Sequence, residues 1–351
     1  MNPSGTFAAR VQEALDTFAA DQRDRLAGAG PSAGVLVDAA LASASGGKRL
    51  RASFCFQGWL AAGGDEDARM VVAAAALEWL QASALVHDDL IDGYDTRRGR
   101  PSMHRRFAAD HREAGWRGDP DGYGSAAAIL LGDLMLTWTD EMFRSCGLPV
   151  ERVGAALPYL DACRSEVVAG QFLDVVAQAS GSSDVRTAMR VLHFKSAKYT
   201  VERPLHLGAA LAGADERLIG ALSRFGLPVG EAFQLRDDVL GVFGDEQITG
   251  KPAGDDLREG KRTVLLAHAH AAADDAQGDL LDRLVGRPDL DAGQVEQLRA
   301  VIVDTGALRA VEEHIAELHD AAVAALEQAP VAEPARSSLR ELAERSVRRA
   351  S

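Results

Sequence analysis

Apolar side chains recur at three- and four-residue intervals along almost the whole chain, which is the spacing of one helical face. In residues 6–29 this face carries Phe7, Val11, Leu15 and Phe18. Residues 71–86 are rich in alanine and therefore have a high helix propensity. No segment alternates strictly between apolar and polar residues, so the sequence predicts no β-strand. We therefore expect an all-α fold.

Short clusters of glycine, proline and aspartate separate the helical segments, which are mostly 15–30 residues long. None of these clusters is long enough to act as a linker, so we expect a single domain over residues 1–351. Residues 105–125 are interpreted as a long surface connection that is partly helical. The charged, amphipathic segment after Gly278 is expected to form helices that close the bundle.

The composition allows a large buried core, because 47% of the 351 residues are hydrophobic and 26% are charged. A net charge of −14 disfavours binding to nucleic-acid phosphates, so no nucleic-acid partner is expected. The longest apolar stretch, residues 71–86, is interrupted by Glu78 and Gln81. It is too short and too polar to span a bilayer, so no transmembrane segment is expected.

The cysteines and the N-terminal residues favour a cytoplasmic location. Cys55, Cys146 and Cys163 lie far apart, and no two cysteines form a CxxC pair. This pattern excludes a cysteine-built zinc site and a disulfide scaffold, and it fits a reducing compartment. The N-terminal residues lack a basic start followed by an apolar run, so no signal peptide is predicted.

A first acidic cluster, LVHDDLID, ends the apolar helix that we expect to begin near Ala68. Asp88 and Asp92 are four residues apart and therefore share a helix face, where two like charges repel by about 0.2–0.5 kcal/mol. A hard divalent cation offsets this repulsion, and oxygen ligands at this spacing suit Mg²⁺. The alternative is a helix end whose acidic residues pair with Arg97 and Arg98.

A second acidic cluster contains Asp237 and Asp238 near the end of another apolar helix. Its third carboxylate is missing, because Gly241 stands at the position equivalent to Asp92. Mg²⁺ is usually held by one or two carboxylates together with substrate phosphates. Two such clusters in one bundle therefore predict a phosphorylated substrate, and its remaining charge requires nearby cations.

Those cations are present, although the chain has only five lysines. Lys48 lies in GGKRLR, at a predicted junction of a loop with a helix, where backbone N–H groups also favour anions. Lys195 lies in the middle of the chain, and Lys251 and Lys261 follow the second acidic cluster. Four of the five lysines thus lie in or beside candidate anion-binding segments.

The ordered set of motifs resembles the trans-prenyl diphosphate synthase family, most closely its bacterial geranylgeranyl diphosphate synthases. The motifs are GGKRLR, LVHDDLIDGYDTRRGRPSMH, GDLML, GQFLD, KS and FQLRDDVLGVFGDEQITGKPAGDDLREGKRT, which together cover roughly residues 40–270. The resemblance implies an isoprenoid synthase-type bundle of long helices around a deep central cavity. It also implies a homodimer that condenses isopentenyl diphosphate with an allylic diphosphate in a 1'-4 elongation.

The resemblance further assigns roles by position. It implies three Mg²⁺ ions, two bound by Asp88 and Asp92 and the third by Asp237, with Asp238 in support. The allylic diphosphate is expected at Lys195, Lys251 and Arg97, and isopentenyl diphosphate at Lys48, Arg51, Arg98 and Gln81. Gln171 and the polar groups around Ser196 are expected to face the developing cation. Gln234 is expected to assist the second acidic cluster, and Lys261 to lie near a closing loop formed by GKPAGDDLREGKR.

Two small residues, Ser83 and Ala84, precede the first acidic cluster. In the family, large aromatic residues there stop the growing chain early, so the resemblance implies a C20 product, with C15 or C25 and longer as alternatives. Trp79 and Trp138 are candidate floors of the cavity. A class I terpene cyclase is less favoured, because its Asn/Ser/Glu metal motif is not found. A non-catalytic subunit is less favoured, because both acidic clusters and the lysines are largely intact.

Overall fold

The computed structural model describes residues 6–97, 99–244 and 254–347. The helices are α1 (Phe7–Leu26), η1 (Ala27–Ala29), α2 (Pro31–Ala44), α3 (Leu50–Ala61), α4 (Ala68–Ile91), α5 (Met103–Glu113), α6 (Pro120–Arg144), α7 (Val150–Ser180), α8 (Val185–Leu192), η2 (His193–Glu202), α9 (Arg203–Ala212), α10 (Glu216–Phe243), α12 (Asp255–Glu259), α13 (Val264–Ala272), α14 (Asp275–Leu284), α15 (Ala292–Asp304), α16 (Ala307–Gln328) and α17 (Ala335–Val347). Two strands, β1 (Thr96–Arg97) and β2 (Arg100–Pro101), pair as an antiparallel hairpin.

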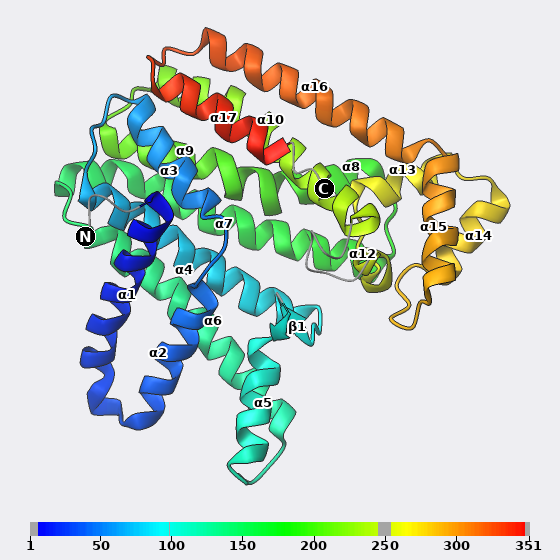
Figure 1. Ribbon diagram of the computed structural model, residues 1–351, viewed down its shortest axis with the longest axis horizontal. Helices are drawn as coiled ribbons and strands as arrows, with labels where there is room; N and C mark the ends of the chain where they lie inside the picture. The colour runs from blue at the N-terminus through cyan, green and yellow to red at the C-terminus, as the bar shows by residue number, and fades with distance from the viewer. Residues whose placement is uncertain (1–5, 98, 245–253, 348–351) are drawn as a thin grey trace.

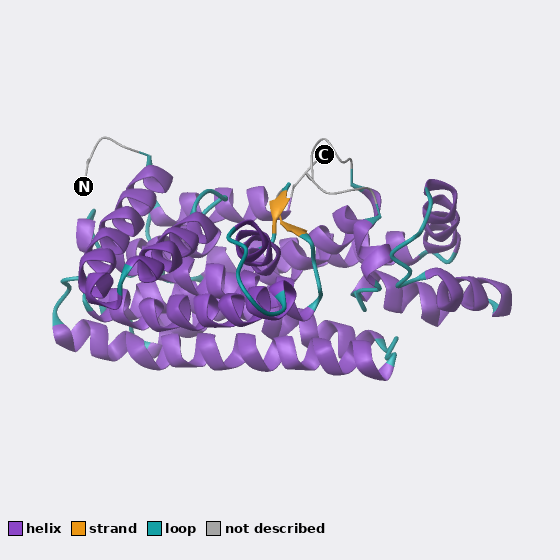
Figure 2. Ribbon diagram, turned by 90° about the horizontal axis from the view of Figure 1, so that it is seen from below, coloured by secondary structure: helices purple, strands orange, loops and turns teal. Residues whose placement is uncertain are grey.

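The long helices α7 and α10 run through the middle of the molecule, and α16 and α17 cover α10 along one edge (Figure 1). Helices α4 and α6 pack against each other along their length, and α5 projects with the N-terminal part of α6 away from the bundle (Figure 1). The same helices, turned by 90°, lie in stacked layers with the small hairpin on one face (Figure 2). The ends of α4 and α10 and the segment η2 together frame the candidate site.

Side-chain caps fix where the principal helices begin. The Thr6 hydroxyl accepts a hydrogen bond from the backbone N–H of Ala9 and so starts α1. The Asp67 carboxylate accepts the N–H of Arg69 at the start of α4, and Asp215 caps α10 in the same way. These caps explain why helices begin where the apolar pattern begins.

Helix α4 is the centre of the largest hydrophobic core. Trp79 and most of its alanines are buried, and the Trp79 ring meets Trp138 of α6 edge-on, with a centroid distance of 5.2 Å. Phe18 of α1 packs against both tryptophans. Among the described residues α4 is the only helix long and apolar enough to cross a membrane, but 72% of that stretch is buried inside the protein. This burial is the expected state of a core helix.

The prediction of an all-α fold is confirmed, with two local corrections. The prediction of no strand is wrong at the β1–β2 hairpin, where two residues per strand are too few to produce an alternating pattern. The surface connection expected over 105–125 is much shorter, because α5 continues to Glu113 and α6 begins at Pro120. Asp119 caps α6 and proline is favoured in a first helical turn, so these residues start a helix.

Candidate active site

The first acidic cluster lies at the C-terminal end of α4, close to two cations. Lys195 Nζ lies 3.3 Å from one carboxylate oxygen of Asp88, and the Arg97 guanidinium lies 3.3 Å from the other. Burial raises the pKa of Asp88, but the charges of Lys195 and Arg97 outweigh it, so the pKa falls below its ordinary value. Burial and the neighbouring Asp88 charge raise the pKa of Asp92 to about 6.

Arg97 is held over the end of α4 by the β1–β2 hairpin. Its Nε donates a hydrogen bond of 2.7 Å to Asp89. Asp89 is buried and therefore acts as an anchor for this arginine, whereas Asp88 remains partly exposed. The alternative reading from the sequence, in which the acidic residues pair with Arg97, thus describes part of this arrangement. Arg98 lies outside the described residues.

Lys195 joins the first acidic cluster to α7. Its Nζ donates to Asp174 over 2.6 Å, so the ammonium lies between two carboxylates of different helices. A Cβ atom on Gly170 would lie 2.4 Å from the Lys195 backbone nitrogen. Only glycine therefore allows α7 to approach η2 closely enough for this contact. Burial lowers the pKa of Lys195, but the Asp88 and Asp174 charges outweigh it and raise the pKa.

The second acidic cluster is connected to η2 by a chain of hydrogen bonds. The Ser196 hydroxyl donates to Gln234 over 2.6 Å, and the Gln234 amide donates to Asp238 over 2.8 Å. Burial first, and the nearby charges of Asp256 and Asp237 second, raise the pKa of Asp238 to about 8. Asp238 is buried while Asp237 is only half-buried, so Asp237 is the more accessible of the two for a ligand.

A second cationic centre lies at the other end of η2. The Arg51 guanidinium donates to Thr200 over 2.9 Å and stacks 4.2 Å from the centroid of the Tyr199 ring. The Tyr199 hydroxyl donates to Gln81 over 2.9 Å. The Arg51 Nε is buried with no hydrogen-bond partner, which leaves a donor for an anion. Lys48 is exposed in the loop that precedes α3.

Helix α12 and the residues after it approach the first acidic cluster. Lys261 Nζ lies 3.0 Å from Asp256 and 2.7 Å from Glu259. The Tyr94 hydroxyl donates to Glu259 over 2.8 Å, and Lys261 lies 5.6 Å from the centroid of the Tyr94 ring. The charge of Lys261 acts both on Asp88 of the first acidic cluster and on Asp238 of the second. Lys251 lies outside the described residues.

The donor atoms of the site fit magnesium. Among the described residues no three acidic, histidine or cysteine side chains are close enough to hold a metal by themselves. The accessible ligands are carboxylate oxygens, which suit a hard cation that takes its remaining ligands from water and phosphate. The amide nitrogen of Gln171 is buried without a partner beside this region, and it offers a further donor to a bound group.

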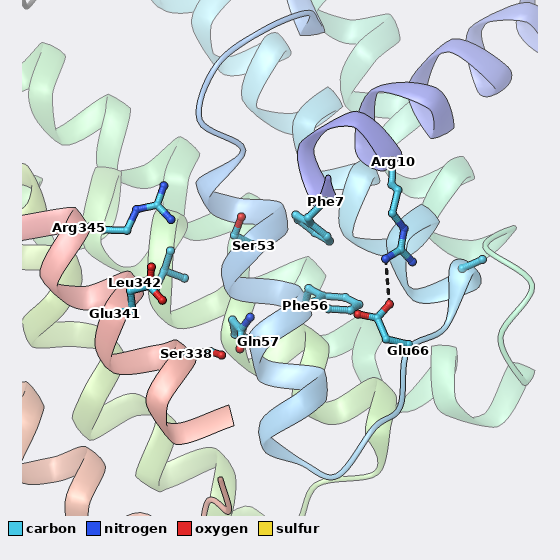
Figure 3. Close-up of a pocket in the computed structure, with 11 residues that line it drawn as sticks. Phe7, Arg10, Ser53, Phe56, Gln57, Glu66, Ser338, Glu341, Leu342 and Arg345 are labelled. Atoms are coloured by element: carbon cyan, nitrogen blue, oxygen red, sulfur yellow. Dashed lines mark hydrogen bonds and ion pairs between the residues drawn. The ribbon is translucent and has the colours of Figure 1, made fainter. Parts of the chain in front are cut away.

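A surface cleft lies elsewhere, between α1, α3 and α17 (Figure 3). Its volume is about 680 Å³, and none of the residues predicted for the site lines it. An ion pair of 2.9 Å between Arg10 and Glu66 crosses its rim (Figure 3). The cleft is therefore separate from the acidic clusters and from η2.

Comparison with known proteins decides which family this arrangement represents. Residues 35–302 match the polyprenyl synthetase family, which is more than half of the chain. The chain belongs to the polyprenyl synthetase family. The predicted isoprenyl-synthase fold and trans-prenyltransferase activity are confirmed by this match and by the relatives that follow.

Two relatives and one solved structure illustrate the likeness. A geranylgeranyl diphosphate synthase of Mycobacterium tuberculosis is 33% identical over 294 residues, 83% of this chain and 78% of the relative. A geranylfarnesyl diphosphate synthase of Aeropyrum pernix is 32% identical over 268 residues, 75% of this chain and 78% of the relative. The Corynebacterium glutamicum geranylgeranyl pyrophosphate synthase, complexed with isoprenyl diphosphate and magnesium, is 40% identical with a TM-score of 0.94, covering 98% and 99% of the two chains.

Sequence reasoning missed several members of this polyprenyl synthetase site. Asp174 follows Gln171 by three residues and shares its helix face, so the GQFLD motif carried a usable signal. Tyr199 and Thr200 lie in the segment that contains Lys195, but nothing local links them to Arg51. The remaining missed residues are Tyr94, Asp89, Asp256 and Glu259.

Proposed function

We propose that this enzyme condenses isopentenyl diphosphate with an allylic diphosphate and releases geranylgeranyl diphosphate, a C20 product. One observation carries the proposal: η2 contacts two separate cationic centres, with Lys195 near one of its ends and Arg51 against Tyr199 near the other. A condensation of two diphosphates requires two such centres at a fixed separation. A cyclase, which binds one diphosphate, has no use for the second.

The proposed binding roles follow from the positions of the charges. Lys195 and Arg97 face the allylic diphosphate, with Lys251 as a third cation. Isopentenyl diphosphate binds to Arg51, Lys48, Gln81 and Arg98. We propose three Mg²⁺ ions held by Asp88, Asp92 and Asp237. Bound Mg²⁺ supplies positive charge that neutralises the diphosphate and makes it a better leaving group.

The protein's own groups favour the bond changes of the elongation. The allylic C–O bond breaks, and its electron pair leaves with the diphosphate, which Lys195 and Arg97 stabilise. The double bond of isopentenyl diphosphate attacks the allylic carbon, while the Gln171 and Ser196 oxygens face the positive charge. The proton then lost passes to the departing diphosphate. The apolar wall of α4 excludes water that would intercept the cation.

The length of the product is proposed to depend on α4. Ser83 is small and buried, and Ala84 is small and partly exposed, so the side chains just before Asp88 leave room for a long chain. Trp79 lies one helical turn below Ser83 on the same face and packs edge-on against Trp138. We propose that this aromatic pair closes the cavity after the fourth five-carbon unit.

The subunit arrangement is proposed to be a homodimer. Apolar side chains are exposed on two consecutive helices, with Leu130 of α6 at 62% and Phe172 of α7 at 66%. Val168, Phe172 and Val176 follow each other at four-residue intervals and therefore share a face of α7. An apolar surface of this kind favours burial against a second copy. A cytoplasmic location is also proposed, because all three cysteines are free and buried.

The proposal is tested by incubating the protein with isopentenyl diphosphate, an allylic diphosphate and Mg²⁺, followed by product analysis. We expect an elongated C20 diphosphate. A released hydrocarbon would identify a terpene cyclase, and absence of turnover would identify a non-catalytic subunit. A product of C15, or of C25 and longer, would support the proposed elongation reaction but contradict the proposed position of the cavity floor.

A further inference from the structure

The second acidic cluster lacks a carboxylate where the first has one. Gly241 lies one helical turn after Asp237, as Asp92 lies one turn after Asp88. A Cβ atom at Gly241 would lie 1.8 Å from a carboxylate oxygen of Asp256, which is far inside van der Waals contact. The Asp256 carboxylate therefore occupies the space in which a side chain at position 241 would begin.

Asp256 is fixed in this place by its own helix. It belongs to α12 and is 6% exposed. The next residue, Leu257, is fully buried, and its carbonyl accepts a hydrogen bond of 2.8 Å from the N–H of Gly286. The Lys261 N–H donates to the Asp256 carbonyl over 3.2 Å, and its ammonium pairs with the Asp256 carboxylate. The carboxylate thus reaches Gly241 from a well-packed element.

This carboxylate also connects the two acidic clusters. Its charge acts on Asp238, the buried member of the second cluster. Lys261 lies between Asp256 and Glu259, and Glu259 accepts the hydroxyl of Tyr94, which follows the first cluster by two residues. Displacing Asp256 would therefore remove one of the two carboxylates that hold Lys261 and leave Glu259 as the other.

We propose that Asp256 supplies, from α12, the third carboxylate that Gly241 leaves out of the second acidic cluster, and that it positions Lys261 and Asp237 for the metal-bound diphosphate. Gly241 and Asp256 then act together, because the absence of a side chain at position 241 leaves room for the Asp256 carboxylate of α12. Asp256 is a positioning residue, and its role rests on the proposed function, which requires a metal-bound diphosphate at this place.

The test measures the apparent affinity for Mg²⁺ independently of turnover. Thermal stabilisation is titrated with Mg²⁺ at a constant concentration of inorganic pyrophosphate, and the half-saturating Mg²⁺ concentration is compared between variants. We expect Asp256→Asn to raise it about 10- to 100-fold, the usual effect of removing an outer partner of a metal ligand. Asp279→Asn, which removes an exposed carboxylate of α14, is the matched control and is expected to leave it unchanged.

A double variant that moves the carboxylate from position 256 to position 241, called the transfer variant, distinguishes a role of the carboxylate at this place from a general effect of lost charge. Asp256→Ala alone is expected to match Asp256→Asn, whereas Gly241→Asp combined with Asp256→Ala returns the carboxylate to α10 and recovers most of the Mg²⁺ affinity. Gly241→Asp alone is expected to lower the melting temperature, because both carboxylates then compete for one space.

Two results overturn the inference. The first is an unchanged half-saturating Mg²⁺ concentration in Asp256→Asn, even with a lower melting temperature, since Asp256 would then be only a counter-ion of Lys261. The second is a transfer variant no better than Asp256→Ala. Failure of the proposed function is seen separately, as a wild-type protein that does not elongate an allylic diphosphate.

Discussion

Replacing Ser83 by phenylalanine is the most direct test of the proposal that α4 sets the product length. Ser83 lies five residues before Asp88, about 7.5 Å along the helix axis, and Trp79 lies nine residues before it, about 13.5 Å. Ser83 and Trp79 are four residues apart and share a face. A growing chain that passes Ser83 therefore next meets the edge-on pair of Trp79 and Trp138.

The substitution is expected to raise the floor of the cavity from position 79 to position 83. This is a displacement of about 6 Å along α4, comparable to the length of one five-carbon unit. We therefore expect Ser83→Phe to change the main product from C20 to C15. The products are measured by chromatography after removal of the diphosphate, at equal conversion for each variant.

Two controls accompany this measurement. Ser83→Ala keeps a small side chain above Trp79 and is expected to preserve the C20 product. The melting temperature of Ser83→Phe indicates whether the larger ring is accommodated, because overpacking a buried position costs about 1–3 kcal/mol. A folded, active Ser83→Phe variant with the wild-type product distribution would refute the floor at Trp79.

Three further predictions concern turnover, stability and assembly. Asp237→Ala is expected to lower kcat by orders of magnitude with little change in melting temperature, and near-normal turnover would contradict its proposed metal role. Burial raises the pKa of Glu166, but hydrogen bonds from Arg203 and Lys198 outweigh this effect and lower the pKa. Ionised Glu166 therefore stabilises the fold at pH values above its unfolded-state pKa, and this stability is lost as the pH falls through its folded-state pKa. Glu166→Gln should therefore cost about 1.5–3 kcal/mol in denaturant unfolding at neutral pH, with a gap to wild type that closes in acid; a gap independent of pH would exclude this cause. Leu130→Asp is expected to halve the mass measured by light scattering, and an unchanged mass would place the interface elsewhere.

The pattern of the sequence predicts those parts of the site whose residues lie within about one helical turn of each other. Asp88 and Asp92 share a face because they are four residues apart, and the long apolar run before them predicts the helix that carries them. The expected start of this helix near Ala68 agrees with the observed start of α4. Local periodicity and side-chain caps are enough to fix such an element.

Contacts between distant segments could not be predicted in this way. Tyr94 and Glu259 are 165 residues apart, and neither lies in a pattern that marks it as a partner of the other. The sequence shows that Gly241 leaves out a carboxylate, but it does not reveal that Asp256 occupies the same space. Asp256 lies 15 residues after Gly241 in the sequence, and only the tertiary fold brings its carboxylate against this glycine.

The geometry of η2 explains why the relative positions of the two proposed substrate sites could not be predicted from the sequence. Residues His193–Glu202 form a π-helix, which ends with a hydrogen bond from the N–H of Arg203 to the carbonyl of Lys198. No local signal predicts this widened turn, and such turns are frequent at functional sites. The turn lets Lys195 reach Asp88 and Asp174 while Thr200, five residues later, meets Arg51. One helical segment therefore carries both Lys195 and Thr200, so the backbone of η2, and not the loops around it, sets the separation of these two residues.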